Sequence, residues 1–199
     1  ESSAASDVYK RQPLHELFKC LDAPSDIRET LQKLKYNSIN IVVVQAKRDF
    51  LGDNFAIFLG DQEIIFHRVT KLNFLGKSYC LEEGGTTLLC EITFRPESYL
   101  GNLSRDEIQT RTIDDLVKCQ FITKEDVFDV EIQSFQYAYV IYDLEHRKNT
   151  NRVLNYLKEQ GIHSCGRFAE FEYMNTDHVA EHTQKLAQKL NQKLTKLEQ

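Results

Sequence analysis

The stretch that decides the fold is GRFAEFEYMNTDH, residues 166–178, which combines a predicted strand, a tight turn and a helix start in one short segment. Gly166 allows close approach to the backbone, and the guanidinium of Arg167 can bind a phosphate through two parallel hydrogen bonds. A helix start attracts anions because its first N–H groups are free and the helix dipole is positive there. The stretch therefore suits a phosphorylated cofactor, and its candidate N-caps are Asn175, Thr176 and Asp177.

The residues after this turn predict a helix, because apolar side chains recur at helical spacing and one face is expected to be buried. The residues before it predict a strand, with Glu170 and Glu172 on the exposed face. A glycine before a charged residue at a strand end is also common in ordinary turns, so the motif alone leaves both interpretations open. The apolar helix positions are Val179, Leu186, Leu190, Leu194 and Leu197, and the other strand face holds Ala169, Phe171 and Tyr173.

Upstream of this stretch, β-branched runs separated by Gly, Asp and Asn predict strands joined by hairpin-sized gaps. Such gaps favour an antiparallel sheet over parallel β-α-β units. Helices are predicted at residues 13–35, after a capping box of Ser104 and Glu107, and in a segment that ends at Gly161. The fold class is therefore α+β, an antiparallel sheet with helices. The predicted strands are residues 39–45, 55–59, 64–72, 86–94 and 128–142.

The composition is that of a globular protein, and it narrows the classes of function. The 199 residues carry a formal net charge of -5, so neither nucleic acid nor an anionic membrane surface is expected as the main partner. No apolar run approaches the length of a membrane span. The five cysteines are scattered without metal-ligand spacing, which predicts neither a metal site nor a disulfide framework and favours a reducing, cytoplasmic location.

The stretch 166–178 resembles the C-terminal signature of a flavoprotein group that comprises FAD-containing amine-oxidase, protoporphyrinogen-oxidase-like and UDP-galactopyranose-mutase-like proteins. The signature reads Gly-Arg-(Phe/Leu)-x-x-(aromatic)-x-Tyr-x-x-x-Asp. In that group the Gly-Arg turn lies along the ribityl chain and phosphates of FAD, and the following helix points its N-terminus at the flavin. The resemblance therefore implies FAD as the cofactor, held by Gly166, Arg167, Asn175, Thr176 and Asp177.

The same resemblance divides the chain into parts. Residues 13–160 would be the substrate-binding part, and residues 161–199 would return as a strand and a helix to an FAD-binding, Rossmann-like domain. The G-x-G-x-x-G fingerprint of such a domain does not occur here, because the paired glycines Gly84 and Gly85 precede a strand. We therefore expect the N-terminal half of the FAD domain to be missing from this chain. We also expect residues 1–12 to be a non-native or disordered tail.

Three residues are candidates for substrate binding. Arg68 lies in a predicted strand whose alternation puts Phe66 and Arg68 on one face and His67 on the other. Arg68 resembles the arginine of the mutase family's aromatic-x-Arg strand, which reaches the flavin and the substrate diphosphate; from periodicity alone it is a sheet-surface arginine. His67 is interpreted as structural. Tyr139 and Tyr173 resemble two mutase tyrosines whose hydroxyls donate to the diphosphate, and both could equally be core tyrosines.

The chain departs from the mutase pattern in three ways: Val140 replaces a proline after Tyr139, the stretch between Arg68 and Tyr139 is longer, and Asn175 stands where an acidic residue is usual, although Asp177 restores the charge. The first functional hypothesis is an FAD-dependent oxidoreductase, in which the flavin accepts hydride from a small-molecule substrate and no side chain is assigned a catalytic role. The alternative is a UDP-galactopyranose-mutase-like isomerase that binds a nucleotide sugar. A third hypothesis is a non-catalytic binding fragment. Binding of UDP distinguishes the mutase from an oxidase.

Overall fold

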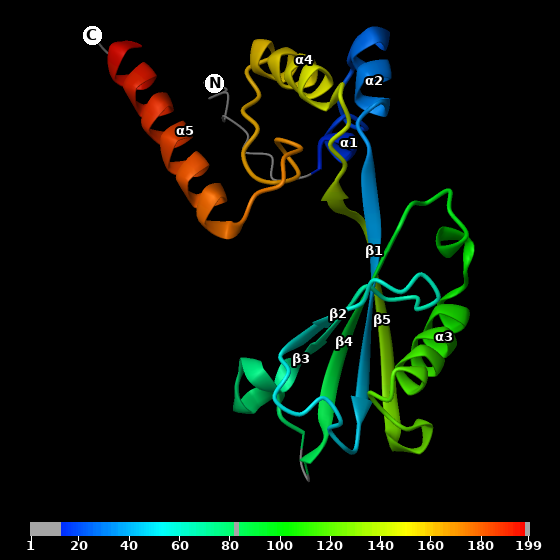
Figure 1. Cartoon of the computed structure of the whole chain (residues 1–199). Coiled ribbons are helices and arrows are strands. Elements are labelled where there is room, and N and C mark those ends of the chain that lie inside the picture. The colour runs from blue at the N-terminus through cyan, green and yellow to red at the C-terminus, as the bar shows by residue number, and fades with distance from the viewer. Residues whose placement is uncertain (1–12, 82–83, 198–199) are drawn as a thin grey trace. The chain divides into compact units, whose positions relative to one another are not determined.

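The computed structural model describes residues 13–81 and 84–197 (Figure 1). The chain divides into two compact units, each of which is described by itself. The described part of the first unit combines residues 13–36 with residues 139–197, and the second unit lies within residues 37–138. The tail predicted at the N-terminus lies outside the described residues.

The second unit is built around a five-stranded sheet with the strand order β2-β3-β4-β1-β5 (Figure 1). Strand β4 pairs antiparallel with β1 and with β3, and β3 pairs antiparallel with β2. The predicted antiparallel sheet is therefore confirmed, and the strand predicted over residues 86–94 coincides with β4. The strands are β1 (Tyr36–Ala46), β2 (Ala56–Phe58), β3 (Arg68–Lys71), β4 (Thr86–Phe94) and β5 (Val127–Val140).

One face of the sheet packs against helix α3 (Arg105–Lys118). Alternate residues of β4 point into this core, and Leu88, Cys90 and Ile92 are at most 1% exposed. Ile108 and Leu116 of α3 belong to the same hydrophobic cluster. Burial of an aliphatic side chain of this size contributes roughly 1.5–3 kcal/mol, so the pairing of sheet and helix provides the main stability of this unit.

The start of α3 confirms the predicted capping box. The hydroxyl oxygen of Ser104 accepts the backbone N–H of Glu107 at 3.3 Å, and the Glu107 carboxylate accepts the backbone N–H of Ser104 at 2.8 Å. These bonds satisfy N–H groups that have no partner inside the helix. Short 3-10 helices complete the unit: η1 (Leu72–Leu75), η2 (Lys77–Tyr79), η4 (Leu100–Asn102) and η5 (Lys124–Asp126).

The strand predicted over residues 64–72 is wrong in its first half, because β3 starts only at Arg68 and the residues before it form turns and bends. The Asp115 carboxylate on α3 accepts the backbone N–H of Ile65 at 2.7 Å, and this contact diverts the backbone from the sheet. Phe66 is 1% exposed and lies in the hydrophobic core. In β3 the buried positions are Val69 and Lys71, and they alternate with Arg68 and Thr70. Phe66 and Arg68 therefore do not share a face, contrary to the prediction.

The first unit packs two short helices, α1 and α2, against α4. Leu14, Val153 and Leu157 in its hydrophobic core are each 0% exposed. Helix α4 ends at Glu159, next to the stop predicted at Gly161: this glycine has a φ of +74°, and the N–H of Ile162 donates to the Leu157 carbonyl oxygen at 2.9 Å. The helices are α1 (Leu14–Leu17), α2 (Ser25–Gln32), α4 (His146–Glu159) and α5 (Thr176–Leu197).

The C-terminal helix α5 begins where the sequence predicts it, but its apolar face is less buried than predicted. Val179, Leu186 and Leu190 are all partly exposed. The side chains of Leu194 and Leu197 lie outside the described part of the chain. The core of the first unit is therefore supplied by α1, α2, α4 and the turn before α5, and not by α5 itself.

Candidate functional site

Residues 166–173 form a compact turn, and not the strand predicted there. The N–H of Glu170 donates to the Gly166 carbonyl oxygen at 2.8 Å, and the N–H of Glu172 donates to the Arg167 carbonyl oxygen at 2.9 Å. The Glu170 carboxylate accepts the N–H of Gly166 at 2.9 Å, which closes the turn from the other side. Gly166 has a φ of +104°, which a regular strand does not have. The interpretation of Glu170 and Glu172 as the exposed face of a strand is therefore wrong.

Two carboxylates connect this turn to neighbouring helices. Oε2 of Glu170 lies 3.1 Å from Nδ1 of His182 on α5. Glu172 accepts bonds from both terminal nitrogens of Arg147 on α4, at 2.9 and 3.1 Å. The first residue of α1 donates its N–H to the carbonyl oxygen of Phe168 at 3.2 Å. The turn is thus fixed by three helices of the first unit, which limits how far its side chains can move.

A buried histidine supports the far end of the turn. His146 is 3% exposed, and its Nε2 donates to the carbonyl oxygen of Phe171 at 3.0 Å. The N–H of Tyr173 donates to the hydroxyl oxygen of Tyr142 at 2.6 Å. Because these two contacts fix the backbone on both sides of Glu172, they set the direction in which Tyr173 projects.

The side chains of Arg167, Tyr139 and Tyr173 come together in the structure, and we call these three residues the Arg167 cluster. The guanidinium carbon lies 4.3 Å from the ring centre of Tyr173, 5.4 Å from that of Tyr139 and 5.6 Å from that of Phe168. The two tyrosine rings are 6.4 Å apart and 19° from parallel. Exposed cation–π contacts contribute about 0.5–1 kcal/mol each. They hold the guanidinium beside two phenol groups, so positive charge and hydroxyl donors can meet an anion together.

The conformation of Gly166 suits a cofactor-binding turn, but its N–H group is not available to a cofactor. A Cβ placed on Gly166 would have Val179 as its nearest neighbour, at 3.8 Å, so the positive φ and not a lack of space requires glycine here. The N–H of Gly166 already binds the Glu170 carboxylate. The charge that this turn offers to a phosphate therefore comes from Arg167.

Helix α5 begins directly after the turn, and its start is open to solvent. Asn175, Thr176 and Asp177 are all exposed. The carbonyl oxygen of Asn175 accepts the N–H of Val179 at 3.1 Å, which places Asn175 at the N-cap through its backbone. The N–H groups of the first helical turn can therefore meet an anion, as the resemblance to flavoproteins implies.

Arg68 lies in the second unit, where a buried carboxylate holds it. Its Nε and Nη2 both donate to Oε1 of Glu91, the first at 2.9 Å, and Glu91 is 5% exposed. The guanidinium carbon lies 5.6 Å from the ring centre of Phe58. Nε2 of His67 lies 3.8 Å from the other oxygen of Glu91. His67 and Arg68 therefore flank the same carboxylate. The prediction that they lie on opposite faces is wrong, because His67 precedes β3 and the alternation of a strand does not apply to it.

The surroundings of His67 favour its neutral form. Burial lowers the pKa of His67, and this effect exceeds the opposing attraction of the Glu91 carboxylate. Nδ1 of the ring lies 3.2 Å from the hydroxyl oxygen of Thr93. A neutral, hydrogen-bonded ring is consistent with the structural interpretation of His67.

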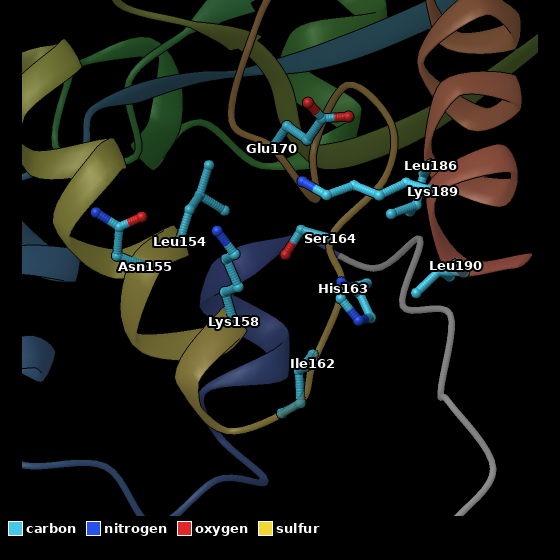
Figure 2. Close-up of a pocket in the computed structure, with 10 residues that line it drawn as sticks. All are labelled: Leu154, Asn155, Lys158, Ile162, His163, Ser164, Glu170, Leu186, Lys189 and Leu190. Atoms are coloured by element: carbon cyan, nitrogen blue, oxygen red, sulfur yellow. The ribbon is translucent and has the colours of Figure 1, made fainter. Parts of the chain in front are cut away.

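Figure 2 shows a groove between α4, the segment that follows it, and α5. The groove has a volume of about 230 Å³, and the side chain of Lys189 extends across it toward Glu170. This volume is below the roughly 300–1,000 Å³ of typical ligand pockets, so the groove alone does not indicate a substrate site. Its aliphatic lining residues are Leu154, Ile162, Leu186 and Leu190.

The structure brings a residue expected at the cofactor into contact with residues expected at the substrate. Arg167 is expected at the cofactor and Tyr139 and Tyr173 at the substrate, and the three side chains are in contact. Sequence reasoning missed the supporting roles of Tyr142 and His146. Their rings lie 4.5 Å apart, but Tyr142 precedes the N-cap Glu145 of α4, so no helical spacing could have indicated the pair.

Within residues 13–81 and 84–197, no three or more His, Cys, Asp or Glu side chains are arranged to hold a metal ion. In the same part of the chain, no helix combines the length and the hydropathy needed to cross a membrane.

No protein-family model matches the sequence, and no curated protein matches it. Solved structures do match the fold. Reduced UDP-galactopyranose mutase matches with a TM-score of 0.73 and 18% identity, over 86% of this chain and 38% of that chain. A protein assigned as a protoporphyrinogen oxidase from Exiguobacterium sp. 255-15 matches with a TM-score of 0.60 and 17% identity, over 80% and 35%. CLA-producing fatty acid isomerase from P. acnes matches with a TM-score of 0.61 and 12% identity, over 91% and 40%.

The chain shares its fold with these three solved structures. The resemblance inferred from residues 166–178 is thereby confirmed at the level of the fold, which is what identities of 12–18% can show. The chain spans only 35–40% of the length of these three structures. What the whole protein binds and catalyses is therefore a matter for proposal.

Proposed function

We propose that this chain is part of an FAD-dependent enzyme, and that its first unit joins the cofactor site to the substrate site. The observation that carries the proposal is the contact of Arg167 with Tyr139 and Tyr173. Such contact places a side chain expected at the cofactor beside side chains expected at the substrate, and a reaction between the two requires both sites to be adjacent. The fold shared with solved flavoprotein-group structures supports the same proposal.

In this proposal the chain's own groups bind and orient the ligands. Arg167 pairs with a phosphate of FAD, and the start of α5 at Thr176 stabilises negative charge on the reduced ring. FAD, when bound, supplies the hydride acceptor. Residues 161–199 would complete an FAD domain whose N-terminal half lies outside this chain, and residues 13–160 would carry the substrate-binding part, including Arg68.

The reaction that we propose first is oxidation of a small-molecule substrate by hydride transfer to the flavin, in a reducing, cytoplasmic setting. Two residues favour an oxidase over a mutase: Asn175 takes the place of the acidic residue of the mutase pattern, and Val140 takes the place of its proline. The protein groups around the flavin would set its orientation and potential and would not enter the reaction covalently.

A second candidate is a nucleotide-sugar isomerase of the UDP-galactopyranose-mutase kind. Two observations favour it: the guanidinium of Arg167 lies beside the phenol groups of Tyr139 and Tyr173, and the match to a mutase structure has a TM-score of 0.73. An arginine with two hydroxyl donors suits a diphosphate, because each can donate to a different phosphate oxygen.

A titration with FAD, followed by flavin fluorescence, tests the cofactor role of the Arg167 cluster. We expect the purified chain to carry no stoichiometric flavin and to bind added FAD weakly but saturably. Arg167→Gln should weaken this binding about tenfold, because it removes a charge-assisted hydrogen bond. Lys185→Gln is the control, since it removes a cation of α5 that pairs with Glu181 at 2.5 Å. Equal FAD affinity in the two variants would contradict the proposal.

A calorimetric titration with UDP separates the two reactions. The isomerase predicts UDP binding that Tyr173→Phe weakens about three- to tenfold, because this substitution removes one hydroxyl and keeps the ring that contacts Arg167. Binding of FAD without binding of UDP favours the oxidoreductase. A chain that binds neither FAD nor UDP would be the non-catalytic fragment, and the enzyme proposal would be wrong.

A further inference from the structure

A second hollow of the first unit lies between α2 and the start of α4. Its volume is about 370 Å³, which is within the range of small-molecule pockets. None of its lining residues belongs to the Arg167 cluster. Its charged lining consists of the cations Lys33, Lys35, Lys148 and Arg152 and the carboxylates Asp143 and Glu145.

The two carboxylates of this hollow are already paired. Nζ of Lys35 lies 2.9 Å from Oδ2 of Asp143, and Nζ of Lys148 lies 2.8 Å from Oε2 of Glu145. The hydrogen bond from Lys35 is the main cause that lowers the pKa of Asp143, so this carboxylate is charged at neutral pH. Four cations and two carboxylates leave an excess of two positive charges around the hollow.

Lys33 and Arg152 supply this excess. Lys33 is exposed and has no ion pair with any residue in the described part of the chain. Nη2 of Arg152 lies 2.5 Å from Oδ2 of Asp26, and these side chains are 54% and 56% exposed. An ion pair this exposed contributes little to stability, so a ligand can draw Arg152 away from Asp26 at small cost.

An amide side chain of the same hollow is open to a ligand. Asn149 of α4 is 9% exposed and lines the hollow. Its amide group is not among the buried side-chain atoms that lack a partner, so the amide can reach the hollow and donate to a ligand there. Thr30 of α2 is 3% exposed and donates its hydroxyl proton to the Asp26 carbonyl oxygen at 2.7 Å. The hollow thus offers an amide donor among cations, which is a binding arrangement for an anion.

We propose that the hollow between α2 and α4 binds a small molecule that carries a phosphate group, through Lys33, Arg152 and Asn149. A phosphate group is attracted by the charge of Lys33 and by Arg152, whose pair with Asp26 is exposed to solvent. Its oxygens point in several directions, so an ammonium, a guanidinium and an amide from two helices can each donate to a different oxygen. The volume leaves room beyond the phosphate for the rest of an ester. This site does not depend on the proposed flavin function.

The test is a titration of the 199-residue chain with inorganic phosphate and, separately, with glucose 6-phosphate, followed by calorimetry at an ionic strength held constant with sodium chloride. Lys33→Gln and Asn149→Ala should each weaken binding about three- to tenfold. Lys158→Gln is the matched control, because Lys158 is an exposed lysine of α4 outside this hollow. Tighter binding of glucose 6-phosphate would identify the ligand as an ester, and equal affinity would identify it as free phosphate.

Absence of saturable binding, or equal weakening by the substitutions at Lys33 and Lys158, would overturn the proposal. Far-UV circular dichroism would show whether Asn149→Ala unfolds α4. If it does, Lys33→Gln still tests the proposal, because Lys33 is exposed. Lys33→Gln should leave the FAD titration unchanged, and Arg167→Gln should leave the phosphate titration unchanged. Failure of one proposal is therefore distinguishable from failure of the other.

Discussion

Replacing Gly166 with alanine would measure how strongly the turn before α5 depends on its backbone conformation. Gly166 has a φ of +104°, and a Cβ there would meet its nearest neighbour, a Val179 methyl group, at the ordinary distance of 3.8 Å. The cost is therefore conformational and not steric. A left-handed conformation costs an L-residue about 1–2 kcal/mol, and the lower entropy of the unfolded alanine chain returns about 0.4–1 kcal/mol. We expect a net loss of about 1 kcal/mol in the free energy of unfolding.

Two other glycines provide matched controls for this substitution. Gly161 has a φ of +74°, and no atom lies within 4 Å of the position that an alanine methyl group would take, so alanine there should cost about as much as at Gly166. Gly60 has the same open space without a left-handed φ, so alanine there should cost nothing. Thermal denaturation followed by far-UV circular dichroism measures the effect, which should lower Tm by about 2–4 °C for a chain of this size. A Gly166→Ala variant as stable as the wild type, or a Gly60→Ala variant equally destabilised, would refute the reasoning.

Three further predictions concern the second unit and a surface thiol. Ser104→Ala removes the capping box of α3 and should lower the free energy of unfolding by about 1 kcal/mol; an unchanged urea midpoint would contradict this. The hydrogen bond from Arg48 is the main cause that lowers the pKa of Asp126. This bond stabilises the fold above the unfolded-state pKa of about 4, and the stabilisation is lost as the pH falls toward the lower folded-state pKa. In urea titrations at different pH values, Asp126→Asn should therefore make the free energy of unfolding depend less on pH in this acid range. Burial raises the pKa of Cys90, so a thiol reagent should label exposed Cys20 rapidly and Cys90 only after unfolding; rapid labelling of Cys90 would show that the core opens.

The elements that could be predicted from the sequence are those decided by residues close together in the chain. The capping box pairs Ser104 with Glu107, and α4 ends where Gly161 can adopt a positive φ. Strand β4 follows its own run of β-branched and aliphatic residues, with alternate positions in the core. In each case the local conformational preference and the tertiary packing favour the same structure.

The two predicted strands that fail do so because distant residues decide the backbone. The Asp115 carboxylate, 50 residues from Ile65 in the chain, accepts the backbone N–H of Ile65, so that this N–H does not bond within the sheet. Residues 166–173 turn because the Glu170 side chain closes on Gly166, and because α4 and α5 hold the carboxylates of this segment. No hydrophobic periodicity reports such contacts. The alternation of charged and apolar residues that suggests a strand is equally compatible with a turn whose carboxylates face two helices.

The candidate site shows the same division. The motif identifies Arg167 and Tyr173, because their spacing along the chain is part of the signature. The contact of both with Tyr139 depends on how β5 ends relative to the turn, within the first unit, and no local pattern contains that information. A sequence can therefore indicate which side chains belong to a site before it can indicate which of them touch.

The strained backbone at Phe171 connects the core of the first unit to the Arg167 cluster. Phe171 has a φ of +51°, which costs a bulky residue about 1–2 kcal/mol. Its ring is 1% exposed in the core, and burial of such a side chain contributes roughly 1.5–3 kcal/mol. The hydrogen bond from His146 to its carbonyl oxygen adds to this, so packing outweighs the strain. Because Tyr173 follows two residues later, the packing that holds Phe171 in this conformation also places the Tyr173 ring against Arg167.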